Sequence, residues 1–190
     1  QETEGLPFFV AEYIKSALEG AQPPAGALAS DEIGPFGDPS THIRYDIPPG
    51  VRALLQSRLD GVDEIGRQLL NTAAVIGRSF HFDTCRLASG RSEEEAVAAL
   101  EELLARGIIE EMNRAGERLP APLYDFSHNQ IRALVYHETS LVRRRLLHRR
   151  VAETLAQHAA DGAQAAQIAR HYLLAGQEAN AAAYFLSLIH

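Results

Sequence analysis

The sequence has no tryptophan, and it has a single methionine and a single cysteine among its 190 residues. Because there is only one cysteine, Cys85, an internal disulfide is excluded, and a reducing compartment is favoured. No apolar run reaches the roughly 18 residues of a transmembrane helix, and no secretory signal pattern is present. We therefore expect a cytoplasmic protein without a membrane partner.

Positive charge is also scarce. Lys and Arg together number 18 against 25 Asp and Glu, which gives a net charge of −7, and Lys15 is the only lysine. Nucleic acids and anionic membranes both attract proteins with an excess of positive charge. The composition therefore disfavours general affinity for either.

Recognisable catalytic and metal-binding motifs are missing. The sequence contains no P-loop, no Gly-rich dinucleotide fingerprint and no nucleophile elbow. His137 and Glu138 are adjacent, whereas a zincin-type metal site needs its ligands on one helical face. We predict no enzyme activity and no metal site for this chain by itself.

The sequence does contain long stretches of helical periodicity. Apolar spacing predicts a short helix over Phe8–Leu18, and the Pro/Gly-rich segment 20–49 that follows reads as a linker. Ser92 and Glu95 form a capping-box pattern at the start of another helix. Further helices are expected over Val51–Leu59, Glu64–Ile76, Phe82–Leu87, Ser92–Arg106, Asn129–Tyr136, Leu141–Ala159, Ala163–Ala175 and Glu178–Ile189.

Two short strands, Ile108–Met112 and Leu123–Phe126, are expected around a polar loop. Three helices followed by a two-stranded wing is the order of elements in a winged-helix domain. The last two helices resemble a tetratricopeptide unit. The expected fold is therefore mainly α: a winged-helix domain with a small two-stranded wing over residues 50–138, then a helical extension and a first tetratricopeptide-like hairpin over 139–190.

In a DNA-binding winged helix, the helix Ser92–Arg106 would enter the major groove. Its single basic residue is Arg106, and its carboxylates would meet the phosphate field with the wrong sign. Sequence-specific DNA binding by this helix is therefore disfavoured. The carboxylates belong to Glu93, Glu94, Glu95, Glu101 and Glu102.

His128 is a candidate sensor, because it comes directly after a strand and begins a helix. The free backbone N–H groups and the positive dipole end of a helix N-terminus can hold an anion such as phosphate. The alternative is that His128 caps its helix or donates a hydrogen bond into the core.

The run Arg143–Arg150 is the only basic cluster. We expect Val142, Leu146, Val151 and Leu155 to form one buried stripe, which leaves the arginines on the other faces of the helix. Those arginines form either a solvated helix face or a surface that contacts phosphate or another domain.

Five segments together resemble a known family. Glu4–Glu12 is similar to the "EGNPFFVEE" element that closes the ATPase module of STAND-class, AAA-like signalling NTPases. Ile47–Leu59, Leu70–Phe80, Tyr124–Tyr136 and Arg143–Glu153 resemble further motifs of that family, in the same order. The combination is typical of large LuxR-type transcriptional regulators and of ATPases associated with bacterial adenylate cyclases. The resemblance covers nearly the whole chain apart from the linker.

The resemblance implies that residues 1–19 are the C-terminal helix of an upstream ATPase module. ADP or ATP with Mg²⁺ would bind to the complete protein, and no cofactor would bind to this chain alone. By analogy, Pro7 would lie against the nucleotide and His128 would touch the ADP phosphate. We take Arg132, Arg143, Arg144 and Arg145 as candidate phosphate or inter-domain contacts. The chain departs from the family at Leu6, where the family has Asn.

The expected function is that of a regulatory, non-catalytic arm of an ATP/ADP-switched signalling or transcriptional regulator. Its partners would be the upstream ATPase domain, downstream helical repeats and effector proteins, with DNA contacted only through another domain. Two alternatives stay open. The chain could be a DNA-binding winged-helix domain of a transcription factor, or a protein-interaction adaptor that uses the hairpin Ala163–Ile189.

Overall fold

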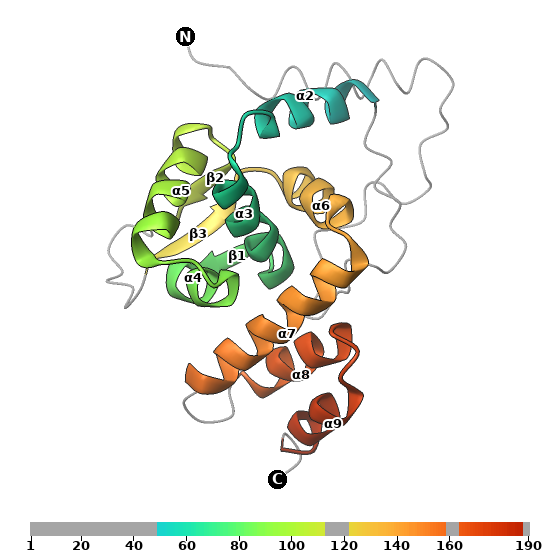
Figure 1. The fold of residues 1–190 in the computed structure, drawn as a ribbon. Helices are drawn as coiled ribbons and strands as arrows, with labels where there is room; N and C mark the ends of the chain where they lie inside the picture. The colour runs from blue at the N-terminus through green and yellow to red at the C-terminus, as the bar shows by residue number, and fades with distance from the viewer. Residues whose placement is uncertain (1–48, 113–121, 159–163, 188–190) are drawn as a thin grey trace. The chain divides into compact units, whose positions relative to one another are not determined.

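The computed structural model describes residues 49–112, 122–158 and 164–187 (Figure 1). The chain divides into two units, residues 1–60 and 61–190. Helix α2 (Pro49–Leu59) is the described element of the first unit, so the helix expected at Phe8–Leu18 and nearly all of the linker lie outside the described residues. No described helix is long and apolar enough to span a membrane.

The second unit is mainly helical and contains a small antiparallel sheet of three strands. Its first part comprises α3 (Glu64–Ile76), β1 (Ser79–His81), α4 (Phe82–Ser89), α5 (Glu93–Ala105), β2 (Ile109–Glu111) and β3 (Leu123–Phe126). Its second part is helical throughout the described residues: α6 (Asn129–Glu138), α7 (Leu141–His158), α8 (Ala165–Leu174) and α9 (Glu178–Ser187) (Figure 1).

Capping side chains set where the first helices begin. The Asp63 carboxylate accepts a 2.6 Å hydrogen bond from the backbone N–H of Gly66, at the start of α3. At the start of α5, the Ser92 hydroxyl accepts from the Glu95 N–H and the Glu95 carboxylate accepts from the Ser92 N–H, both at 3.2 Å. The predicted capping box is confirmed. It satisfies two backbone donors that the helix itself leaves without partners.

Replacing Ser92 with alanine removes one half of this capping box. We expect S92A to lower the free energy of unfolding by about 1 kcal/mol, the usual cost of losing an N-cap hydroxyl. Urea denaturation of the variant and the parent chain measures the difference. S92T, which keeps a hydroxyl at the same position, should recover most of the loss. Equal losses in S92A and S92T would contradict the role given to the hydroxyl.

The sheet has the order β1-β3-β2, with β3 in the centre. The two predicted strands pair with each other, Ile109 opposite Phe126, and the sheet has a third strand that the sequence analysis did not predict. The third strand, β1, pairs with the other edge of β3 and places Ser79 opposite Asp125. A strand of three residues with one buried side chain, Phe80, is too short to show alternation, so it is recognisable only from its pairing.

An aromatic cluster connects β1 and β3. The ring of Phe80 lies 6.0 Å from that of Tyr124 and 6.1 Å from that of Phe126, measured between centroids. Phe126 is 1 % exposed, and Ile108 and Leu103 beside the sheet are also buried. Large buried aromatic side chains contribute strongly to stability because they remove much apolar surface from water. This cluster therefore fixes β3 and, through it, the start of α6.

The buried stripe of α7 differs from the expected one. Val142 is 81 % exposed, whereas Leu147, His148, Val151 and Leu155 are buried. Helix α7 packs against α3, α4 and α8. The periodicity of a helix does not show which of its turns such neighbours cover, so it could not predict the exposure of Val142.

Candidate functional site

His128 occupies the junction that the sequence predicts, between β3 and α6. It is the N-cap residue of α6, with an extended backbone (φ −140°, ψ 133°), and its carbonyl accepts a 3.0 Å hydrogen bond from the Ile131 N–H. The side chain makes no capping hydrogen bond to the helix and is half-buried. The imidazole therefore does not cap α6, which was one of the two structural alternatives for His128.

Arg132 lies one turn further along α6 and contacts the end of α3. Its Nε donates a 3.2 Å hydrogen bond to the carbonyl oxygen of Ala74. Ala74 belongs to the last turn of α3, where carbonyl groups lack intrahelical partners and the helix dipole is negative. In this arrangement the side chain holds α6 against α3.

The three adjacent arginines of α7 point in different directions, because successive helical residues are turned by about 100°. The guanidinium carbon of Arg144 lies 4.9 Å from the centre of the Tyr136 ring, in cation–π geometry. Arg145 is exposed to solvent. Arg143 lines a pocket that also contains Arg150, seven residues further along the helix. The structure therefore does not gather Arg132, Arg143, Arg144 and Arg145 into one site, and Pro7 lies outside the described residues.

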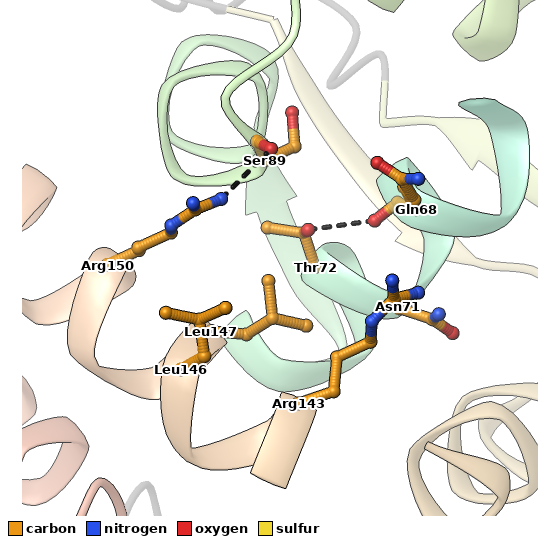
Figure 2. A pocket seen from close by; sticks show the side chains of 8 residues that line it. All are labelled: Gln68, Asn71, Thr72, Ser89, Arg143, Leu146, Leu147 and Arg150. Carbon is orange, nitrogen blue, oxygen red and sulfur yellow. Dashed lines mark hydrogen bonds between the residues drawn. The ribbon is translucent and has the colours of Figure 1, made fainter. Parts of the chain in front are cut away.

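The pocket, which we call the arginine pocket, is a hollow of about 190 Å³ between α3, α4 and α7 (Figure 2). Helix α7 contributes Arg143 and Arg150 together with two leucines between them. Helices α3 and α4 contribute amide and hydroxyl groups. Besides the two arginines, the lining residues are Leu146, Leu147, Gln68, Asn71, Thr72 and Ser89.

Hydrogen bonds hold several of these polar groups in place. The Thr72 hydroxyl donates to the Gln68 carbonyl at 2.8 Å, and the Asn71 side-chain oxygen accepts from Thr139 at 3.2 Å. Arg150 Nη1 donates a long 3.4 Å bond to the carbonyl of Ser89, the last residue of α4. These bonds leave the pocket with fixed walls and with donor groups at its edges.

Sequence reasoning named Arg143 but did not connect it with Arg150 or with the polar face of α3. Two signals were present. A spacing of seven residues puts two side chains on the same helical face. Gln68, Asn71 and Thr72 follow the i, i+3, i+4 pattern of one face in an otherwise apolar helix.

A second polar cluster is completely buried, where α7 packs against α8. His148 and His171 are 2 % and 0 % exposed, and their Nδ1 atoms lie 2.9 Å apart, so one ring donates to the other. His148 Nε2 lies 3.1 Å from the Tyr136 hydroxyl. His171 Nε2 is buried and has no hydrogen-bond partner among the described residues. Burial, together with the neighbouring His148 and Arg170, lowers the pKa of His171 to about 3.

The described residues contain no group of three or more His, Cys, Asp or Glu side chains that could hold a metal ion. Cys85 is buried, and burial raises the pKa of its thiol well above the usual value, so the reactive thiolate is disfavoured. Cys85 is therefore better suited to packing in the core than to acting as a nucleophile.

No protein-family model, no curated protein and no solved structure was found to match this chain.

Proposed function

We propose that this chain is the regulatory, non-catalytic arm of a nucleotide-switched regulator of the STAND class. In this proposal the winged helix predicted over residues 50–138 contacts ADP held by an upstream ATPase domain. The helices that follow transmit the nucleotide state to helical repeats and to effector proteins. ADP would favour a closed state and ATP an open one, which requires that the two nucleotides differ in affinity for the two states.

Helix α5 carries the proposal. The order α3, β1, α4, α5, β2, β3 and the sheet order β1-β3-β2 suit a winged helix, in which α5 would be the DNA-reading helix. Its first turn is Glu93, Glu94 and Glu95. The one arginine at its end, Arg106, donates to Glu102 at 2.8 Å and to the Gly61 carbonyl at 2.7 Å. A winged helix whose reading helix is acidic is better suited to contacts within a protein than to DNA.

His128 would be the residue through which nucleotide is sensed. It begins α6, and α6 is attached to α3 through Arg132 and Ala74. At its other end α6 carries Tyr136, which contacts Arg144 and His148 of α7. A phosphate held or released at His128 could therefore shift α6 and, with it, the helices that lead to the repeats.

The test uses the protein that contains the upstream ATPase domain. We expect H128A to weaken ADP binding about tenfold or more, because a hydrogen bond to a charged group contributes about 1.5 to 3 kcal/mol. Basal activity should rise as the closed state loses its ligand. Isothermal titration calorimetry measures ADP affinity directly. H137A, on the same helix but exposed, is the matched control and should bind ADP like the parent protein. Equal ADP affinity in H128A and H137A would contradict the proposal.

DNA binding is the second candidate, favoured by the winged-helix order of elements and by the exposed Arg145 and Arg149 of α7. We expect no salt-dependent binding of duplex DNA by this chain, because α5 repels phosphate. Fluorescence anisotropy of labelled duplex DNA measures the binding, and low ionic strength is the decisive condition because the attraction to phosphate is strongest there. Binding that weakens steeply with added salt would favour the DNA-binding alternative.

The hairpin α8–α9 supports the proposed link to helical repeats. Gly176 turns the chain with a positive φ of 78°, and the rings of Tyr172 and Tyr184 stack at 5.7 Å between the two helices. Phe185 and Leu186 on α9 are 44 % and 59 % exposed. In a tetratricopeptide-like array, the next hairpin would cover such apolar side chains.

A further inference from the structure

The arginine pocket has positive charge at both of its ends. Arg143 and Arg150 stand at opposite ends of the hollow, and Leu146, Leu147 and Thr72 lie between them (Figure 2). We propose that the arginine pocket binds a small, elongated dianion, such as an aliphatic dicarboxylate, with one anionic group on Arg143 and the other on Arg150. The site is separate from His128, so it stands or falls independently of the nucleotide switch.

The charge balance of the pocket favours an anion. No carboxylate is among its lining residues, although the chain as a whole is acidic. The guanidinium of Arg143 makes no hydrogen bond or ion pair with a described residue, and that of Arg150 makes only the long hydrogen bond to the Ser89 carbonyl. A guanidinium has several N–H donors in a planar fork that matches a carboxylate. Both arginines therefore keep donors available for an anionic group.

The polar wall offers a further donor. The side-chain oxygen of Asn71 accepts a hydrogen bond from Thr139, and the amide N–H₂ group, on the side of Arg143, makes no hydrogen bond to a described residue (Figure 2). Gln68 is held from outside the pocket, since its Oε1 accepts from Arg91 and its Nε2 donates to Glu64. One end of the pocket thus combines an amide donor with a guanidinium.

Size and spacing determine the class of ligand. The hollow of about 190 Å³ is smaller than the roughly 300 Å³ at which pockets for drug-sized molecules begin, so it cannot enclose a nucleotide. Seven residues separate the two arginines, which is about 10 Å along the helix axis. A compact anion would engage one arginine, whereas an elongated one can reach both. The leucine side chains between the arginines suit a methylene chain better than a polar one.

Binding would also have a structural consequence. Arg143 and Arg150 belong to α7, whereas Asn71 and Ser89 belong to α3 and α4. A ligand that contacts both sides would hold α7 against the core, and a ligand that binds only the folded state raises the melting temperature. The occupied pocket would therefore stabilise the packing of the helical extension on the rest of the unit.

The experiment titrates the 190-residue chain with dicarboxylates of increasing length, from malonate to pimelate, at constant ionic strength. Acetate and inorganic phosphate serve as compact anions. Isothermal titration calorimetry gives the affinities. We expect affinity to peak at one intermediate chain length, at least tenfold above acetate and phosphate. The proposal that one ligand binds to both arginines would be overturned if affinity did not depend on the length of the dicarboxylate. It would also be overturned if phosphate bound as tightly as the best dicarboxylate.

The variants use a charge-matched pair. R143Q/R150Q should weaken binding of the best dicarboxylate at least tenfold, whereas R145Q/R149Q, which removes the same charge from α7 residues that do not line the pocket, should change it less than twofold. Circular dichroism checks that both variants are folded. Equal weakening in the two variants would mean general charge attraction and would overturn the proposal. Amide chemical shifts of Thr72 and Gly90 in the unmodified chain provide a second readout, and the absence of any shift at saturating ligand would also overturn it.

Discussion

Acidification from about pH 7.5 to about pH 5 should destabilise the folded chain by about 2 kcal/mol through His171 alone. The pKa of His171 is lowered from 6.5 to about 3 in the folded state. pH 5 lies about 1.5 units below the pKa that His171 has in the unfolded chain. Each of these units lowers the free energy of unfolding by about 1.4 kcal/mol. Since the ring is almost fully buried, solvent screening removes little of this effect.

The sign follows from which state binds the proton. Between pH 6.5 and about 3, the unfolded chain carries a protonated His171 and the folded chain does not. The stabilisation is therefore complete above pH 6.5 and is lost as the pH falls towards the folded pKa. The physical cause is that an added proton on His171 would place a charge in a buried site where Nε2 has no acceptor among the described residues.

Urea denaturation at several pH values measures this dependence. H171Q removes the titrating group and keeps a side chain that can hydrogen-bond to His148. We expect H171Q to lose about 2 kcal/mol less than the parent chain between pH 7.5 and pH 5. H137Q, at an exposed position, is the matched control and should behave like the parent. The same pH dependence in H171Q and H137Q would contradict the assignment to His171.

Replacing Phe126 with alanine should have a larger effect, a loss of about 3 to 5 kcal/mol in the free energy of unfolding. Phe126 is 1 % exposed, its ring lies 6.1 Å from that of Phe80, and it pairs with Ile109 in the sheet. Truncation of the side chain would leave a cavity where β3, the central strand of the sheet, meets α6. Because His128 follows two residues later, the loss would also loosen the candidate sensor.

F185A is the matched control for F126A. Phe185 is 44 % exposed on α9, so the same chemical change there should cost less than about 1 kcal/mol. Thermal and urea denaturation of both variants measure the two losses. Similar losses of unfolding free energy in F126A and F185A would contradict the central role given to the aromatic cluster around β3 in the core.

Local signals in the sequence were sufficient to predict most of the described helices. The capping box at Ser92 and Glu95, and the glycine after α3, mark helix ends through backbone hydrogen bonds that involve only neighbouring residues. Strands β2 and β3 were recognisable because the short segments Ile108–Met112 and Leu123–Phe126, which each begin with apolar residues, lie on either side of a polar loop. These features depend on a few adjacent residues, and one sequence is enough to detect them.

Features that depend on packing were missed. Strand β1 exists because β3 has a second edge to pair with, and Val142 is exposed although the apolar periodicity of α7 predicts that it is buried. The arginine pocket joins residues 68–72, 89 and 143–150, and the contact between His148 and His171 spans two helices. No local pattern marks residues that meet only after the helices have packed.

The candidate site was predictable only in part. The position of His128 between a strand and a helix followed from the sequence, whereas the separate directions of Arg132, Arg143, Arg144 and Arg145 did not. Helical geometry alone makes three consecutive arginines diverge, so Arg143 to Arg145 could not have formed one cluster. The spacing of Arg143 and Arg150 is the more informative signal in that run.

The central claim is that this chain helps to hold ADP on an upstream ATPase domain. The most direct measurement is the rate of ADP release from the protein that carries that domain, compared with the same protein truncated before Pro49. We predict release at least tenfold faster after truncation, because the proposed phosphate contact from His128 would be lost. Identical release rates with and without residues 49–190 would contradict the claim.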